Sequence, residues 1–359
     1  MRYAGSVFPY AGIAPSRNWR KGVSSVDRGA IDPQTSVRFT IDRKTKLASA
    51  GSCFALRIAE HVQRFGFTYI ITEPGPPWLD AAERRANGYG EYSARYGNVY
   101  STLQLLQLAQ RSLGLFEPLE EAWPAGTAFV DPYRPTIQPD GFVSERELAA
   151  DRAQHLAAVR RLWHETDVLI LTLGLTEIWY DARDGAVFPV PPGRGGGIFD
   201  PARHRSRNLS IDENVGYLED FLGLLWGVNP EVRVILTVSP VPLAATIEDQ
   251  HVIVASAYSK AVLRVTADQI VRRHPQVDYF AAYEIVTGTG NNETYFAEDR
   301  RNVTEAGVNH VMSSFYRNYC GEELAEMTPV ARAAASAPET QPCDEDLLLD
   351  ALARDTSLQ

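Results

Sequence analysis

The sequence predicts a doubly wound α/β domain with a mostly parallel, five-stranded sheet and long loop insertions. Buried apolar runs of strand length alternate with segments of helical pattern along most of the chain. The clearest run, residues 167–174, is almost continuously apolar, which suits a parallel sheet covered on both faces. Glycine and polar residues follow the strands. Ligands bind outside the carboxyl ends of the strands in such sheets, so we expect a site there.

The expected elements follow from local patterns. Strands are predicted at residues 47–50, 67–71, 167–174, 232–238 and 277–280. Helices are predicted at about residues 53–65, 101–113, 145–165, 210–226, 252–273 and 304–319. In the first helix, Phe54, Ile58 and Val62 recur at helical spacing and Gly66 ends the pattern. Residues 72–140 and 181–208 are irregular, so we expect two loop insertions, with a flexible flap at the glycine run 193–197 of the second.

The composition bounds the organisation of the chain. Residues 1–45 are rich in Pro, Gly, Arg and Ser and are expected to form an extended arm on a domain that spans 46–320. Residues 321–359 form an acidic tail, expected to be flexible, that holds much of the net charge of −10. The remaining body has no basic stripe, which argues against nucleic acid as a partner.

The location and cofactor class also follow from the composition. No run approaches the roughly 20 apolar residues of a membrane span, and the start lacks a secretory apolar region. The 3 cysteines form no disulfide framework and have no metal-ligand spacing. We therefore expect a cytoplasmic protein without a metal or cofactor. The oligomeric state stays open.

The segment Gly51-Ser52-Cys53 places two types of nucleophile at a strand-to-helix corner. Backbone N–H groups at a helix N-terminus carry partial positive charge, so the corner favours an anion or oxyanion. The structural alternative is that Gly51 permits a tight turn, Ser52 caps the helix and Cys53 is a small core residue.

The pentapeptide Gly51-Ser-Cys-Phe-Ala55 resembles the signature of the GSCFA family, which is related to the SGNH (GDSL-like) hydrolases. Later segments resemble further family blocks in order: 96–100, 171–179, 237–242, 258–260 and 295–299. The resemblance implies an SGNH-hydrolase-like fold with flavodoxin-like strand order. It also implies ester cleavage or O-acyl transfer on a carbohydrate or similar metabolite.

The same resemblance assigns the reacting groups. Alignment on the glycine of the first block places Cys53 at the nucleophile, and a shift of one residue places Ser52 there. The last SGNH block, Asp-x-x-His, falls on Asp299 and Asn302. Asn302 therefore stands where the resemblance implies the histidine base, and an amide cannot accept the proton.

Further residues are implied to bind the substrate or the oxyanion. Gly97 matches the glycine of the second block, and Thr176 replaces the asparagine of the third. The complete predicted set is Gly97, Asn98, Gly174, Thr176, Glu177 and Tyr283.

Three interpretations of the site remain. In the first, Cys53 attacks, since a thiol at a helix N-terminus ionises more easily than serine, and a histidine from elsewhere (His204, His251 or His310) assists it. In the second, Ser52 attacks with Asp299 or Glu177 as its base. In the third, the protein binds a carbohydrate or acyl ligand in polysaccharide metabolism without turnover.

Overall fold

The central sheet of the computed structural model has four parallel strands, and the structure describes residues 8–193, 195–289 and 295–329. The strand order is β1 (Leu47–Gly51), β4 (Val168–Leu173), β8 (Arg233–Val238) and β9 (Val277–Tyr279). Gly51 lies in register with Thr172, which in turn pairs with Thr237. The ends of the three longest strands therefore meet at one edge of the sheet.

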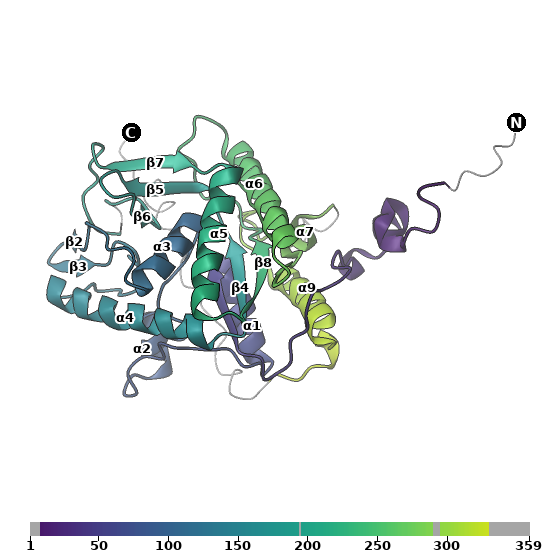
Figure 1. Cartoon of the computed structure of the whole chain (residues 1–359), viewed down its shortest axis with the longest axis horizontal. Helices are drawn as coiled ribbons and strands as arrows, with labels where there is room; N and C mark the ends of the chain where they lie inside the picture. The colour runs from purple at the N-terminus through teal and green to yellow at the C-terminus, as the bar shows by residue number, and fades with distance from the viewer. Residues whose placement is uncertain (1–7, 194, 290–294, 330–359) are drawn as a thin grey trace, which may run out of the picture.

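Helices cover both faces of the sheet (Figure 1). One face packs against α3 (Thr102–Ser112), α4 (Glu145–Glu165), α5 (Ile211–Val228) and α6 (Val252–Arg273). The other packs against α1 (Cys53–Arg64), α7 (Ala282–Thr287) and α9 (Glu305–Phe315). Along β4, Leu169 and Leu171 face the first layer, whereas Val168 and Ile170 face the second. The continuous apolar run of this strand is thus explained by burial on both sides.

The fifth strand that was predicted at residues 67–71 does not form part of the sheet, because Tyr69 makes only an isolated bridge with Leu47. Beyond Leu47, side chains occupy the edge of β1. Ser49 N donates to Ser93 Oγ at 3.3 Å, and the Tyr96 hydroxyl donates to the Ser49 carbonyl. A neighbouring strand cannot pair with groups that are already bonded. The central sheet therefore has four strands, and the flavodoxin-like order of five strands is not confirmed.

The predicted loop insertion at residues 181–208 contains regular structure. β5 (Glu177–Asp181) pairs in antiparallel fashion with β6 (Val187–Phe188) and with β7 (His204–Asn208). Both ends of the insertion are therefore anchored in a small second sheet.

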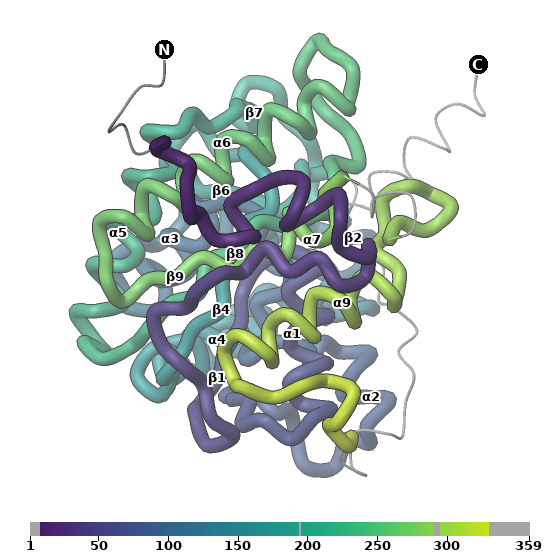
Figure 2. Tube along the Cα trace, turned by 90° about the vertical axis from the view of Figure 1, so that its right-hand side faces the viewer, coloured from purple at the N-terminus to yellow at the C-terminus, as the bar shows by residue number. Residues whose placement is uncertain are grey.

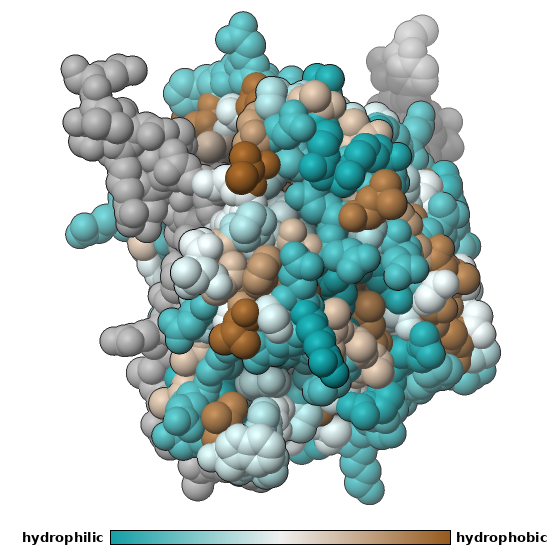
Figure 3. Space-filling model, turned by 90° about the vertical axis from the view of Figure 1, so that its left-hand side faces the viewer, coloured by the Kyte–Doolittle hydropathy of each residue, from teal (hydrophilic) through white to brown (hydrophobic). Residues whose placement is uncertain are grey.

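The first insertion contains a short helix, α2 (Ala81–Ala86), and a hairpin of β2 (Trp123–Ala125) and β3 (Ala128–Val130). The face that carries these small sheets is mostly hydrophilic, with hydrophobic residues in separate spots (Figure 3). Scattered apolar side chains of this kind are normal on a protein surface. Among the helices of the described residues, none has the length and apolar character needed to cross a membrane.

The N-terminal segment runs across the face next to α9, as Figure 2 shows in purple. Gln34 Nε2 donates to the Tyr279 carbonyl at 3.2 Å, and Asp278 accepts from Arg38 N at 2.9 Å. These bonds cover the outer edge of β9, which would otherwise be open to pairing with another chain. Residues 8–30, none of which is buried, extend away from the body (Figure 1).

In the described part of the predicted acidic tail, residues 321–329, Glu322 pairs with Arg43 and Glu323 pairs with Arg317. The remainder of the tail lies outside the described residues.

Candidate functional site

Three segments converge at the carboxyl ends of β1 and β4. Val99 N donates to the Gly51 carbonyl at 2.8 Å, and Leu175 N donates to the Tyr100 carbonyl at 2.8 Å. Both strand-end glycines are needed for this approach. A Cβ at Gly51, where φ is +150°, would lie 2.4 Å from the Thr172 carbonyl oxygen. A Cβ at Gly174 would lie 2.9 Å from the Tyr100 oxygen and 3.3 Å from Ser52 Cβ.

Buried hydroxyl groups gather at this edge of the sheet. The side-chain oxygens of Ser52, Thr172, Thr176 and Thr237 are buried and have no hydrogen-bond partner in the described part of the chain. Thr172 and Thr237 are register neighbours, and Ser52 follows the strand residue paired with Thr172. Buried polar atoms are normally bonded, so such a group marks a place where a ligand or water would be held.

The two predicted nucleophiles differ in accessibility. Ser52 is the N-cap of α1 but its side chain bonds no backbone N–H, and the residue is 4% exposed. Cys53 is the first residue of α1 and is partly exposed, with one side against the core cluster that contains Phe54. Cys53 is therefore the more accessible of the two residues at the corner.

Lys260 of α6 is a site residue that the sequence reasoning missed. The side chain is 4% exposed, and its Nζ donates to the Gly174 carbonyl at 2.7 Å. The preceding residue, Ser259, accepts a hydrogen bond from Thr176 N at 3.1 Å. The available signal was its place in the 258–260 block and its spacing of four residues from Ser256 and three from Leu263, both of which are buried on the same helical face. A buried ammonium group is thus bonded to Gly174, the residue that lies next to Ser52.

Gly97 and Asn98 lie in the segment that reaches Gly51. Gly97 has φ of +66° with open space where a side chain would be. The Asn98 side-chain oxygen accepts from the Tyr92 hydroxyl at 2.8 Å, and Gln104 Nε2 donates to the Asn98 carbonyl at 2.9 Å. These bonds hold the segment in place beside the corner.

Asp299 and Asn302 form a local turn. The Asp299 carboxylate accepts from Arg301 N at 2.9 Å, from Asn302 N at 3.0 Å and from Asn302 Nδ2 at 2.5 Å. Burial by itself raises the pKa of Asp299, but these hydrogen bonds outweigh it and lower the pKa below its ordinary value. Arg300 in the turn has φ of +55°. Arg301 Nε donates to the Pro242 carbonyl at 3.3 Å, which anchors the turn to the segment after β8. A carboxylate held in this way is a weak base.

The structure gives Glu177 and Tyr283 other contacts. The Glu177 carboxylate accepts from Thr246 Oγ1 at 2.6 Å and from Ile247 N at 3.1 Å, so it holds the segment before α6. Tyr283 lies in α7 and packs partly buried against the core. Neither contact involves Ser52 or Cys53.

The three histidines considered as bases have partners elsewhere. His310 Nδ1 lies 2.8 Å from the Tyr295 hydroxyl, and His251 Nδ1 accepts from the N–H of residue 253 at 3.2 Å. His204 bonds to Glu120. Since Ser52 Oγ has no partner among the described residues, no histidine activates it in this structure.

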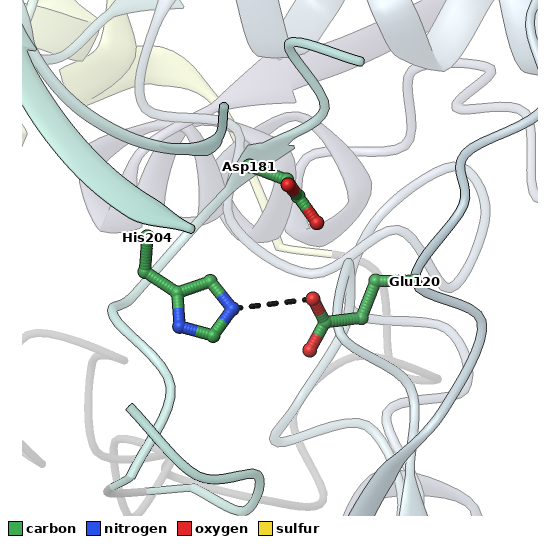
Figure 4. A group of neighbouring side chains, drawn as sticks. All are labelled: Glu120, Asp181 and His204. Carbon is green, nitrogen blue, oxygen red and sulfur yellow. Dashed lines mark hydrogen bonds and ion pairs between the residues drawn. The ribbon is translucent and has the colours of Figure 1, made fainter. Parts of the chain in front are cut away.

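Glu120, Asp181 and His204 bring potential ligand atoms within 4.8 Å of one another (Figure 4). His204 Nδ1 accepts from Asp200 N at 2.9 Å, so in the neutral ring Nε2 carries the proton and donates to Glu120 at 3.2 Å. That nitrogen then has no lone pair for a metal ion.

Two arginines compensate the carboxylates of this group. Arg183 Nε lies 3.0 Å from both oxygens of Asp181, and Arg203 Nη2 lies 2.5 Å from Glu120. A divalent cation would have to displace both. The donor set therefore fits an ion-pair network that ties β5 and β7 to the first insertion better than it fits a metal centre.

The converging segments all lie within residues 46–315, which match the GSCFA family over that whole range. The chain belongs to the GSCFA family. This assignment confirms the resemblance based on the Gly51–Ala55 pentapeptide. No curated protein matches this GSCFA chain.

Solved structures are similar to this GSCFA protein only at a distance. A family 3 carbohydrate esterase of Clostridium thermocellum has 12% identity and a TM-score of 0.27, covering 77% of this chain and 96% of that chain. An acetyl esterase mutant with an acetate ion has 10% identity and a TM-score of 0.32, with coverages of 74% and 92%. A family 3 carbohydrate esterase from Talaromyces cellulolyticus has 14% identity and a TM-score of 0.25, with coverages of 60% and 87%. Similarity at this level decides neither the fold nor the activity.

Proposed function

We propose that this GSCFA protein is an SGNH-like ester hydrolase or acyltransferase that uses Cys53 as its nucleophile. The observation that carries the proposal is the contrast at the corner, where Cys53 is partly exposed and the Ser52 hydroxyl is buried without a base. A cysteine depends less on an adjacent base than a serine, because its thiolate forms at lower pH. The substrate class, an O-acylated carbohydrate or similar metabolite, rests on the relation of the family to SGNH enzymes.

The proposed chemistry has two steps. The Cys53 thiolate attacks the ester carbonyl carbon, and the resulting oxyanion accepts hydrogen bonds from N–H groups at the start of α1 and from the Thr176 hydroxyl. The intermediate breaks the carbon–oxygen bond, and the alcohol leaves with a proton from solvent. Water or an acceptor hydroxyl then attacks the thioester and gives its proton to solvent, and cleavage of the carbon–sulfur bond releases the acid or the new ester and regenerates the thiolate. The Lys260 ammonium favours the anionic states.

A second candidate function is ligand binding without turnover. The observation that favours it is the Asp299–Asn302 turn, in which both side chains are bonded to each other and no imidazole is present. The corner hydroxyls and partly buried aromatic residues would then hold a carbohydrate or acyl ligand. Turnover assays with nucleophile variants separate the two functions, as argued in the Discussion.

The first test of the thiolate is its rate of alkylation. At about neutral pH, iodoacetamide is expected to label Cys53 at least about ten times faster than Cys320, because the thiolate reacts and the thiol does not. Cys320 is a suitable internal control, since burial raises the pKa of its thiol to about 12. The measurement is peptide mass spectrometry over time, with Cys53→Ala to confirm the assignment. Equal or slower labelling of Cys53 would count against the proposal.

The Lys260 ammonium is expected to promote this labelling. In Lys260→Met, alkylation of Cys53 at neutral pH should slow by about three- to tenfold, and its pH–rate profile should move to higher pH, because a nearby positive charge stabilises a thiolate. Ser259→Ala, which removes the neighbouring hydroxyl and keeps the charge, is the matched control and should label like wild type. Unchanged labelling in a folded Lys260→Met variant would remove Lys260 from the proposed site.

A further inference from the structure

A small cavity lies between α3, α4 and the chain around residue 133. Its polar lining includes Gln104, Gln107, Arg111, Tyr133, Arg134 and His155, and it has room for about one water-sized particle. Val99 and Tyr96 also line it, so the cavity is directly behind the segment that reaches Gly51. An occupant would therefore support one wall of the candidate site.

Arg111 is the unusual group in this cavity. The residue is 9% exposed, and its guanidinium makes no hydrogen bond or ion pair with the part of the chain that the structure describes. It lies over the ring of Tyr133, 4.1 Å from the centroid. Burial lowers the pKa of Arg111 to about 10, so the group stays charged at neutral pH. Asp131 attracts Arg111 electrostatically but forms no direct ion pair with it. A buried charge without a directly bonded counter-ion is unfavourable.

The neighbouring carboxylates are already paired with other arginines. Asp131 pairs with Arg134 at 2.9 Å and with Arg152 at 3.3 Å. Asp151 pairs with Arg95 at 2.7 Å and with Arg134 at 2.8 Å. The arginines of the cluster are Arg95, Arg111, Arg134 and Arg152, and the carboxylates are Glu73, Asp131 and Asp151. When His155 is neutral, these side chains carry four positive and three negative charges, so one positive charge is left uncompensated.

His155 provides a second buried nitrogen without a partner, and in the neutral ring this nitrogen accepts a hydrogen bond but cannot donate one to an anion. Its Nδ1 lies 2.8 Å from Glu73 Oε2, and its Nε2 is buried with no hydrogen bond among the described residues. Burial and the positive charge of Arg134 lower the pKa of His155 to about 4, so its imidazole ring is neutral at pH 7. Water could donate to Nε2 and accept from Arg111, but it would leave the positive charge uncompensated.

We propose that this cavity binds one small monovalent anion of the size of chloride, with Arg111 as its counter-charge. The anion supplies the missing negative charge and accepts from Arg111 Nη2, and the cavity is too small for a larger organic anion. Binding here needs neither Cys53 nor turnover, so this proposal is independent of the proposed function. Its effect is to fasten the segment that carries Asn98 to α3 and α4.

The test is thermal unfolding of the full chain in sodium chloride and in sodium gluconate at the same ionic strength. A ligand that binds only the folded state raises the unfolding temperature in proportion to the logarithm of its excess over Kd. We expect a rise of about 2–4 °C with chloride over gluconate for wild type. Arg111→Met should abolish the difference, whereas Arg272→Met, at an exposed side chain, should keep it. Equal unfolding temperatures of wild type in the two salts would overturn the proposal.

A second measurement does not depend on the folding of a variant. Crystals of the wild-type protein grown with sodium bromide should show an anomalous peak in the cavity, within hydrogen-bond distance of Arg111 Nη2. Bromide peaks at the surface alone, or a water molecule that fills the cavity, would contradict the proposal.

Discussion

Cys53→Ala is expected to lower kcat/KM for ester hydrolysis by at least about a thousandfold, because loss of a nucleophile removes the covalent pathway. Ser52→Ala is expected to stay within about tenfold of wild type. The Ser52 hydroxyl is buried without a partner, so its removal leaves no new unsatisfied group. The measurement is hydrolysis of 4-nitrophenyl acetate and of acetylated sugars at neutral pH.

The controls separate the three interpretations of the corner. Cys320→Ala, a second thiol away from the site, should have full activity if Cys53 is the only reacting cysteine. If Ser52→Ala abolishes turnover and Cys53→Ala does not, the serine is the nucleophile. If the wild type and every variant match buffer on all esters, the hydrolase proposal fails and the binding function is favoured. Circular dichroism confirms that each variant is folded.

Asp131→Asn is expected to lower the free energy of unfolding by about 3–5 kcal/mol, because it leaves buried arginines without their counter-charge. Asp131 is fully buried and pairs with Arg134 and Arg152. The matched control is Asp268→Asn, since Asp268 pairs with the exposed Arg272 and should contribute at most about 1 kcal/mol. Urea unfolding measures both. A loss for Asp131→Asn no larger than that of the control would contradict the expectation.

The ion pairs of Asp131 with Arg134 and Arg152 should weaken in acid. Burial by itself raises the pKa of Asp131, but Arg134, Arg152 and Arg111 outweigh it and lower the pKa below its ordinary value. A lowered pKa means that the stabilisation is complete above about pH 4 and is lost as the pH falls. The difference in stability between wild type and Asp131→Asn should therefore narrow below about pH 4.

Local pattern was sufficient for most of the fold. The helix predicted at 252–273 is α6, and the apolar run at 167–174 became β4 of a parallel sheet. The pattern failed at residues 67–71, where Ser93 and Tyr96 occupy the edge that a fifth strand would need. It also failed at β7, whose sequence His204-Arg-Ser-Arg-Asn208 has no apolar alternation and forms a strand only because β5 lies beside it.

The sequence by itself determined the family, the main helices and the strand-to-helix corner at Gly51-Ser52-Cys53, since spacing and glycine placement are local properties. Only the tertiary structure decided what surrounds that corner. It buries the Ser52 hydroxyl, brings Lys260 to the Gly174 carbonyl and holds Asp299 within its own turn. Lys260 is 86 residues from Gly174 in sequence. No periodicity encodes such a contact, because it depends on how α6 packs against the sheet.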